Sequence, residues 1–230
     1  MSWLARFEVD ERTARLQGMK DSYSWHKRLW DCFPGEPERR RDFLTRVDDF
    51  DGHYRIWLLS RDNPVRPEWC PPGNFSVKEI APVFLSHKRY AFDVRVNPVK
   101  TIVQRGPAGE ALFQPNGKKK QGKRVPIVKY EDLLEWIRRK GKIRCRDKQT
   151  GLEIPGGFII VEDAKRPLEI TPMIENHFRK QVHTGYHGSV QFRGILEVTD
   201  KNYFTETYYA GFGSAKAFGF GLMLLAPVED

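Results

Sequence analysis

Two kinds of hydrophobic spacing along the chain predict strands and helices in alternation. Residues 3–9 place apolar side chains at every second position, which is the period of a strand with one buried face. Residues 21–33 instead repeat a large apolar side chain at every fourth position, which is typical of an amphipathic helix. Asp21 or Ser22 can cap the start of this helix, and a proline followed by a glycine ends it.

The first part of the chain predicts three further strands. Residues 43–47 and 54–60 are apolar runs joined by an aspartate-rich turn over residues 48–52, and residues 75–80 form another short run. A proline-rich connection spans residues 62–73. This part therefore predicts a unit of one strand, one helix and three strands.

The second part of the chain repeats this mixture of elements. Residues 131–140 predict a helix, because acids begin it, bases end it and Gly141 can cap it, and Asp200 can cap a final helix. Strands are predicted near residue 143 and at residues 90–96, 158–161, 189–198 and 222–226. The whole pattern predicts an α+β protein with two similar domains, residues 1–86 and residues 87–230.

Composition and charge narrow the class of protein. The 230 residues are 40% hydrophobic, and Lys plus Arg outnumber Asp plus Glu by 39 to 30, which gives a net charge of +9. Such a charge attracts polyanions, and nucleic acid is the first candidate. No apolar run is long enough to span a bilayer, and the N-terminal segment lacks the layout of a signal peptide, so we expect a cytoplasmic protein without membrane contact.

The cysteines indicate neither a disulfide framework nor a metal site. Cys32, Cys70 and Cys145 are odd in number and widely separated, which is not the spacing of zinc ligands. We therefore expect reduced cysteines, no metal and no cofactor.

Basic residues gather in two runs. The first run lies at the C-terminal end of residues 104–124, a segment rich in glycine and lysine that we expect to form a mobile loop. The runs consist of Lys118, Lys119, Lys120, Lys123 and Arg124, and of Arg138, Arg139, Lys140, Lys142, Arg144 and Arg146. A run of charges is usually a solvated surface, but two such runs in a chain of this net charge favour nucleic-acid binding.

A glycine-rich segment near the C-terminus predicts a loop that holds phosphate. Gly211, Gly213, Gly219 and Gly221 can adopt positive φ and let a polyanion reach the main-chain amides, while Lys216 adds a positive charge. The alternative is a structural one, in which a glycine ends the preceding helix and a tight turn leads into the last strand.

One pair of side chains suggests acid–base chemistry. Tyr23 and His26 are three residues apart on a predicted helix, so both lie on one face. Cleavage of RNA without a metal needs a base for the ribose 2′-hydroxyl proton and an acid for the departing 5′-oxygen, and histidine can serve near neutral pH. The alternative is that His26 is an ordinary surface or packing histidine.

Three other histidines do not predict a metal site. His177, His183 and His187 share a short span, but Gly185 lies between them and no acid stands in helical register with them. A loop near phosphate accounts for these histidines equally well.

Four segments of the chain form a recognisable combination. They are Tyr23-Ser-Trp-His26-Lys-Arg-Leu-Trp-Asp-Cys-Phe-Pro34, Arg95-Val-Asn-Pro-Val-Lys-Thr-Ile102, Arg124-Val-Pro-Ile-Val128 and Gly211-Phe-Gly-Ser-Ala-Lys-Ala-Phe-Gly-Phe-Gly-Leu222. Together they resemble the CasE family, the endoribonucleases that process repeat RNA in type I-E CRISPR systems. The resemblance follows the order of the chain and covers nearly all of it.

The resemblance implies a tandem ferredoxin-like fold and a metal-independent reaction. Members of the family cut precursor CRISPR RNA at the base of each repeat hairpin, leaving a 2′,3′-cyclic phosphate and a 5′-hydroxyl. Their catalytic tyrosine and histidine correspond to Tyr23 and His26, and Asp31 replaces a lysine that helps in some members. The family's glycine loop corresponds to residues 211–221. Together with the basic residues noted above, the predicted RNA-binding residues are Lys27, Arg28, Lys100, Lys118, Lys119, Lys120, Lys123, Arg124, Arg138, Arg139, Gly211, Gly213, Lys216, Gly219 and Gly221, with Lys27 or Arg28 as a substitute for the missing lysine.

The resemblance also implies partners, and it leaves alternatives open. Members of the family commonly keep the mature crRNA and join the Cascade complex. A second hypothesis is therefore a non-catalytic RNA-binding subunit of such an assembly. A general binder of single strands is a third, but it needs exposed aromatic side chains on a sheet, and most aromatic residues here suit core positions.

Overall fold

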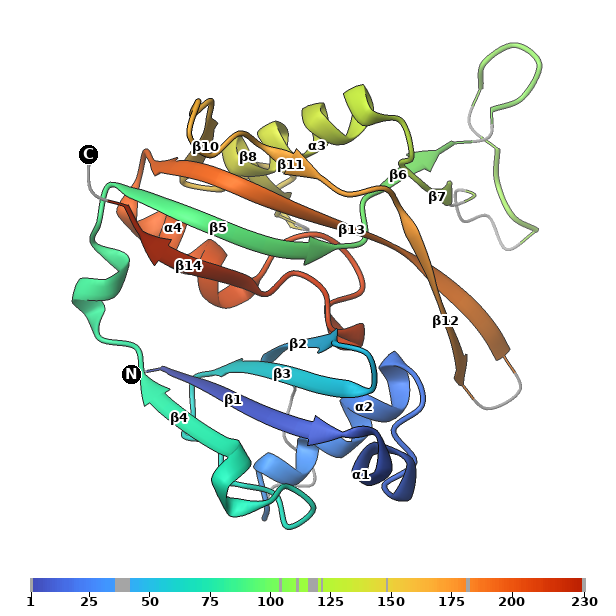
Figure 1. Cartoon of the computed structure of the whole chain (residues 1–230). Helices are drawn as coiled ribbons and strands as arrows, with labels where there is room; N and C mark the ends of the chain where they lie inside the picture. Colours follow the sequence, from blue (N-terminus) through green and yellow to red (C-terminus); the bar gives the residue numbers. More distant parts are fainter. Residues whose placement is uncertain are drawn as a thin grey trace.

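The computed structural model describes residues 2–35, 42–103, 105–110, 112–115, 120, 122–147, 149–180 and 183–228. Two antiparallel sheets form the body of the protein, one from each half of the chain (Figure 1). No helix within these described ranges is both long and apolar enough to cross a membrane.

The first sheet confirms the strands expected in the N-terminal half. Its strands are β1 (Trp3–Asp10), β2 (Leu44–Asp49), β3 (His53–Ser60) and β4 (Phe75–Glu79), in the order β2-β3-β1-β4. The alternation of β1 buries Ala5, Phe7 and Val9 against Trp25 and Leu29 of a helix. One face of the sheet is thus covered, and the helices lie on the side away from the second sheet (Figure 1).

The helix that covers this face is α2 (Ser22–Leu29), continued by the 3₁₀ turn η1 (Trp30–Cys32). Its start is a capping box: Asp21 Oδ1 accepts from the Ser24 amide at 2.8 Å, and Ser24 Oγ accepts from the Asp21 amide at 2.9 Å. The expected helix and its Asp21 cap are therefore confirmed.

A short helix was not expected. Helix α1 (Glu11–Leu16) follows β1 directly, with Asp10 as its N-cap. Its six residues bury only Ala14, so the segment is too short to show a helical period of apolar positions.

The second sheet has the same order as the first. Its main strands are β5 (Arg89–Val96), β10 (Phe158–Val161), β13 (His183–Val198) and β14 (Met223–Pro227), in the order β10-β13-β5-β14. Helix α3 (Tyr130–Lys142) follows its first strand and α4 (Lys201–Ala210) follows its third, and Asp200 caps α4 as expected.

Each half is a ferredoxin-like unit. In both sheets the strands, numbered within the unit, lie in the order 2-3-1-4, and a helix joins the first strand to the second. In the first unit a connection with the 3₁₀ turn η2 (Pro72–Asn74) stands where the second unit has α4. The expected α+β class and the tandem ferredoxin-like fold are confirmed.

One expected helix end is wrong. Gly141 lies inside α3, which extends to Lys142, and it does not cap the helix. A Cβ at this position would stand 2.5 Å from the carbonyl oxygen of Phe158 on the neighbouring strand. The glycine therefore permits close packing between helix and sheet.

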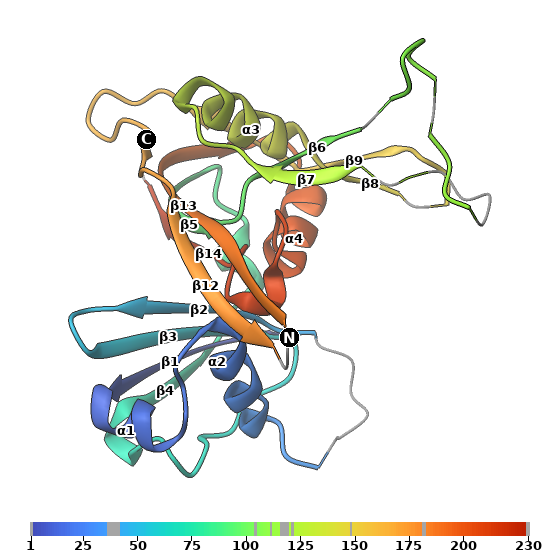
Figure 2. The ribbon, with the colours of Figure 1, turned by 90° about the vertical axis from the view of Figure 1, so that its right-hand side faces the viewer.

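Several hairpin strands were not expected. β12 (Ile174–Lys180) pairs with the first part of β13 and forms a long arm, and β12 contacts α2 of the other half (Figures 1 and 2). Shorter unexpected strands are β6 (Val99–Ile102), β7 (Lys123–Pro126), β9 (Glu153–Pro155) and β11 (Glu169–Ile170). The strand expected near residue 143 is confirmed as β8 (Ile143–Arg146), which pairs with β9. The end of the expected loop over residues 104–124 thus belongs to β7, which pairs with β6.

The two units meet through packing and through buried charge. Leu44 and Leu59 of the first sheet join the core cluster of the second half, and Arg46 of β2 binds Asp93 of β5. The chain passes between the sheets over residues 80–88, which include the 3₁₀ turn η3 (Pro82–Leu85). The domain division at residues 86 and 87 stays a prediction.

Candidate active site

His26 lies half-buried on α2, where the capping box fixes the start of the helix. Its ring packs against Trp30 and Phe43, with centroid distances of 6.2 Å and 5.9 Å. Trp25 and Leu29 of the same helix are buried in the core. These contacts hold the half-buried imidazole at a defined place beside Trp30 and Phe43.

A pocket of about 230 Å³ joins His26 to the glycine-rich segment. Its walls come from the start of α2, from β2 and β3, from β5 and from residues 218–220. The lining residues are Met19, Lys20, Asp21, Ser22, Trp25, His26, Thr45, Val47, Asp49, Tyr54, Arg95, Phe218, Gly219 and Phe220. Two motifs that are almost 200 positions apart in sequence thus share one pocket, while Tyr23, half-buried on α2, is not among its lining residues.

The glycine-rich segment forms a closed loop between α4 and β14. Gly211 ends α4 with φ at 62°, and Gly221, with φ at 86°, leads into the last strand. A Cβ on Gly211 would lie 2.8 Å from the Gly221 carbonyl oxygen, and one on Gly221 would lie 2.6 Å from that of Phe212. The two ends of the loop therefore pack main chain against main chain.

This packing separates the four glycines into two pairs. Gly211 and Gly221 are buried, and the Gly221 amide donates to the carbonyl oxygen of Arg95 at 2.8 Å. The expectation that Gly221 offers its amide to phosphate is therefore wrong for this conformation, and the structural alternative holds at both ends. Gly213 and Gly219 are half-buried, have φ at 85° and remain candidates for main-chain contact with RNA.

Lys216 belongs to the 3₁₀ turn η4 (Lys216–Phe218) in the middle of the loop. Its Nζ donates to the carbonyl oxygen of Ala210 at 2.7 Å and so satisfies the C-terminal end of α4. An ammonium group has three donors. Lys216 therefore stabilises the loop and stays a candidate for a phosphate contact.

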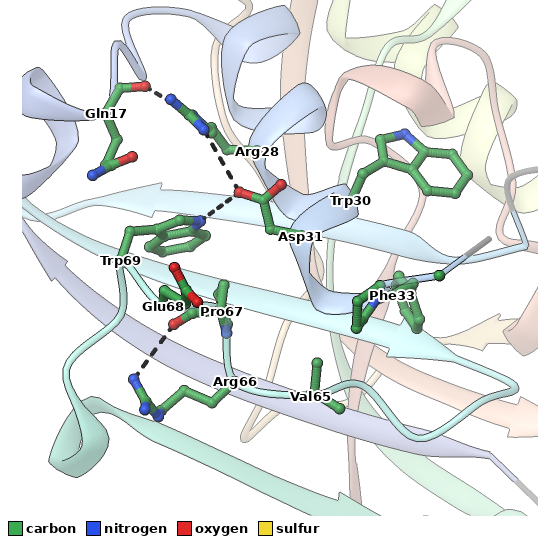
Figure 3. Close-up of a pocket in the computed structure, with 12 residues that line it drawn as sticks. Gln17, Arg28, Trp30, Asp31, Phe33, Val65, Arg66, Pro67, Glu68 and Trp69 are labelled. Atoms are coloured by element: carbon green, nitrogen blue, oxygen red, sulfur yellow. Dashed lines mark hydrogen bonds and ion pairs between the residues drawn. The ribbon is translucent and has the colours of Figure 1, made fainter. Parts of the chain in front are cut away.

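The two cations proposed to replace the missing lysine do not line the His26 pocket. Arg28 lies in a separate hollow of about 1110 Å³, where its guanidinium donates to the Gln17 carbonyl oxygen and lies 3.7 Å from Asp31 (Figure 3). The same Asp31 carboxylate accepts from the Trp69 indole at 3.0 Å. Lys27 is exposed on α2.

Part of the first basic run adjoins the glycine-rich segment. Lys123 and Arg124 are exposed on β7 and line a second pocket of about 530 Å³ together with Ser214, Ala215 and Phe218. Phe218 also lines the His26 pocket. Phe218 is therefore shared by the pocket of His26 and the pocket of Lys123 and Arg124.

The other expected RNA-binding cations that the structure describes line neither of these two pockets. Lys100 is 3.2 Å from Asp132, and Arg138 donates to Glu162 at 2.6 Å. Arg138 and the exposed Arg139 belong to α3, which lies at the opposite end of the molecule from α2 (Figure 1). Lys120 is exposed, and Lys118 and Lys119 lie outside the described residues.

The remaining histidines have separate surroundings. His177 of β12 lies 3.4 Å from Glu175. His187 of β13 packs its ring on Phe218 at 4.5 Å and lines the second pocket, and burial lowers its pKa. The described ranges hold no group of three or more His, Cys, Asp or Glu side chains that could bind a metal ion, and the side chain of His183 is outside them.

Two cations of the His26 pocket were missed in the sequence. Lys20 precedes α2, and Arg95 lies on β5, which belongs to the other half of the chain. Arg95 falls within a segment that carried the family resemblance, which was the one signal that pointed to it.

Comparison with known proteins identifies the family of this chain. A family described as "CRISPR associated protein" matches residues 2–227. The chain belongs to this family. The "CRISPR system Cascade subunit CasE" of Escherichia coli strain K12 is 26% identical to it over 209 residues, which cover 91% of this chain and 94% of that protein. The resemblance to CasE seen in the sequence is thereby confirmed.

Solved structures of the family share the fold over the full length of the chain. The CRISPR-associated protein Cas6e from E. coli K-12 matches with a TM-score of 0.66 at 23% identity, covering 99% of this chain and 100% of that one. Thermus thermophilus Cse3, bound to an RNA representing a pre-cleavage complex, matches with a TM-score of 0.67 at 23% identity, covering 98% and 99% of the two chains. At this level of identity the likeness shows the fold.

Proposed function

We propose that this family member is a metal-independent endoribonuclease. It binds the repeat hairpin of precursor CRISPR RNA, cuts at the base of the stem and keeps the product. The observation that carries the proposal is the pocket in which His26 of α2 meets Gly219 of the glycine-rich segment, next to the two cations of β7.

The relatives support this substrate class. Cse3 is called a CRISPR endoribonuclease and has been solved bound to a 19-nucleotide RNA, and the E. coli relative is called a Cascade subunit. By extension, the partners of this chain are the repeat hairpin, the mature crRNA and a Cascade complex. Its place of action is then the cytoplasm.

The reaction needs one internal nucleophile and proton transfer at two oxygens. A base removes the proton of the ribose 2′-hydroxyl, and the oxygen attacks the adjacent phosphorus. The bond from phosphorus to the 5′-oxygen breaks, and that oxygen takes up a proton. The products are a 2′,3′-cyclic phosphate and a 5′-hydroxyl, and neither proton transfer requires a metal.

His26 supplies the group that moves a proton near neutral pH. Tyr23, one turn earlier on α2, orients the reacting groups or shares the proton. The half-buried Gly213 and Gly219, with Lys216 between them, hold the RNA backbone beside the histidine. Binding of the hairpin places the 2′-oxygen in line with the bond to be broken, and this positioning supplies much of the rate.

Stem recognition follows from the chemistry of A-form RNA. Its deep groove hides the base edges, so a protein reads the stem through its shape, phosphates and 2′-hydroxyls. Lys123 and Arg124, exposed beside the glycine-rich segment, provide phosphate contacts of this kind.

The test is incubation of the wild-type chain with its repeat hairpin in excess EDTA. We expect one cut at the stem base, and no cut when the nucleotide before the cleavage site carries a 2′-deoxy sugar. Strict dependence on added divalent metal would overturn the mechanism. Tight binding without any cut would favour a non-catalytic RNA-binding subunit instead.

A further inference from the structure

Arg95 reaches from the second sheet into the pocket of the first unit. Its Nη1 donates to the Val47 carbonyl oxygen at 2.6 Å, and its Nη2 donates to Asp48 Oδ1 at 2.7 Å. Its main-chain oxygen accepts the amide of Gly221. Arg95 therefore fixes the relative positions of β5, β2 and the glycine-rich segment.

A second layer of charge holds the Arg95 guanidinium in place. Asp48, which is buried, also accepts from Arg46 Nε at 2.8 Å, and Arg46 binds Asp93 of β5. Gln191 of β13 donates to both oxygens of Asp93, at 2.7 Å and 2.9 Å. One buried carboxylate thus serves two guanidinium groups, and the Arg95 side chain is oriented before any ligand binds.

The same guanidinium is available to a ligand. The Arg95 side chain is 26% exposed and lines the pocket that also contains His26 and Gly219. Its hydrogen bonds to Val47 and Asp48 use two of the five N–H donors of a guanidinium. The planar fork of N–H groups that remains matches the oxygens of a phosphate.

We propose that Arg95 is a further catalytic residue, whose guanidinium binds a non-bridging oxygen of the phosphate that is cut. This inference rests on the proposed function. Negative charge grows on the non-bridging oxygens as the 2′-oxygen attacks, and a positioned cation in a partly dry pocket stabilises that charge more than it stabilises the substrate. Arg95 thereby fills the role that Arg28, engaged with Asp31 in another hollow, does not fill.

The pocket offers a second cation, and the geometry favours Arg95 over it. Lys20 is exposed in the connection before α2, whereas Arg95 is held by two hydrogen bonds, one of them to the buried carboxylate of Asp48. A pre-oriented cation needs less reorganisation when charge develops. Lys20 contributes through general attraction of RNA.

The experiment compares single-turnover cleavage of the repeat hairpin by Arg95→Ala, Arg95→Lys and wild type. Arg89→Ala is the matched control, because Arg89 lies on the same strand and face, is 21% exposed and is paired with Asp163 at 3.4 Å. We expect Arg95→Ala to lose roughly 10²–10³-fold in rate while Arg89→Ala cuts at the wild-type rate. Binding of the uncleavable 2′-deoxy hairpin by Arg95→Ala should weaken by less than about tenfold.

Chemical rescue separates catalysis from structure. Added guanidinium at low concentration should restore part of the Arg95→Ala rate, whereas urea at the same concentration should not. Two results would overturn the inference. One is a cleavage rate of Arg95→Ala within about threefold of wild type. The other is a loss of rate that guanidinium does not restore and that a parallel loss of affinity accompanies. If wild type itself does not cut the hairpin, the proposed function fails, whatever the Arg95 variants do.

A second measurement keeps the inference falsifiable if Arg95→Ala does not fold. Each non-bridging oxygen of the scissile phosphate is replaced in turn by sulfur, which gives two phosphorothioate diastereomers. The rates at which wild type and Arg95→Lys cut each diastereomer are then compared. We expect wild type to be slowed by one of the two diastereomers, and Arg95→Lys to lose that preference. If wild type and Arg95→Lys prefer the same diastereomer to the same extent, Arg95 does not contact a non-bridging oxygen of the scissile phosphate.

Discussion

Arg46 of β2 and Asp93 of β5 form a two-point ion pair between the halves of the protein. The Nη1–Oδ1 distance is 2.8 Å and the Nη2–Oδ2 distance is 3.3 Å, and the Arg46 side chain is only 4% exposed. Burial alone would raise the pKa of Asp93, but hydrogen bonds and charge from Arg46, with further bonds from Gln191 and Arg193, outweigh it and lower the pKa. The pair therefore ties the two sheets together most strongly when Asp93 is ionised.

This pair predicts a loss of stability in acid. A carboxylate whose pKa is lowered by folding contributes stability that is fully present above its unfolded pKa of about 3.9 and is lost as the pH falls through the folded value. Asp93→Asn should cost on the order of 2–3 kcal/mol at pH 7, because it leaves Arg46 buried with one partner fewer, and it should flatten the fall in stability below pH ~4. Urea unfolding from pH 7 to pH 3 measures both effects.

The control for that measurement is Asp132→Asn. Its carboxylate is 40% exposed and faces Lys100, so it should cost less than about 1 kcal/mol. Equal losses for the two variants would show that the Arg46–Asp93 pair does not link the halves.

The two kinds of glycine in the C-terminal loop predict different outcomes on substitution. Gly221→Ala places a methyl group 2.6 Å from a buried carbonyl oxygen and should unfold the loop or the protein. Gly219→Ala meets no atom closer than 3.7 Å, so it should fold with a loss of about 1–2 kcal/mol from its positive φ. Thermal denaturation checks this order, and a larger loss at Gly219 would contradict it.

Gly219→Val tests the loop as a ligand site, because its branched side chain stands where RNA would approach the main chain. We expect a folded protein with weaker affinity for the repeat hairpin. Wild-type affinity and salt dependence in a folded Gly219→Val protein would mean that the loop is only structural.

Lys216 should contribute to RNA binding as well as to the end of α4. Lys216→Ala removes one phosphate contact, so affinity should fall for all hairpin sequences and the slope of log K against log salt should shrink by about one unit. Filter binding at several salt concentrations measures the slope. An unchanged slope with lower stability would show that Lys216 has a structural role only.

The two basic runs should differ in their contribution to binding. Lys123 and Arg124 share a pocket with the glycine-rich segment, whereas Arg138 and Arg139 lie at the far end of the molecule. The double alanine variant on β7 should therefore lose more affinity and more salt dependence than the double variant on α3. A larger loss of affinity in the α3 double variant would indicate that the RNA stem binds along α3 and not beside β7.

Local patterns in the sequence predicted most of the fold. The alternation in β1 and β5 and the caps at Asp21 and Asp200 each depend on residues close in sequence, and the structure confirms all four. Strand β12 was missed because its pairing with β13 forms an arm beyond the main sheet. Gly141 was read as a helix end because the contact with Phe158 that requires a glycine is not visible in the sequence.

The sequence predicted individual residues of the site but not which of them lie together. His26 and the glycine-rich segment were recognised separately, and only the fold shows that they line one pocket. Arg95 was missed because its role depends on Asp48 and on Gly221, and the three residues belong to three distant parts of the chain. Arg28 was proposed as a substitute cation, but it lies 3.7 Å from Asp31 in another hollow, which the sequence alone does not show.

The most direct test of the account is the single-turnover rate of His26→Ala on the repeat hairpin in EDTA. His53→Ala is the matched control, since His53 is an exposed histidine of the same unit that pairs with Glu8 on the first sheet. We expect His26→Ala to bind the hairpin with wild-type affinity and to cut it about 10²–10⁴-fold more slowly, while His53→Ala cuts at the wild-type rate. Cleavage by His26→Ala at the wild-type rate would contradict the account and would pass the catalytic role to His177, His183 or His187.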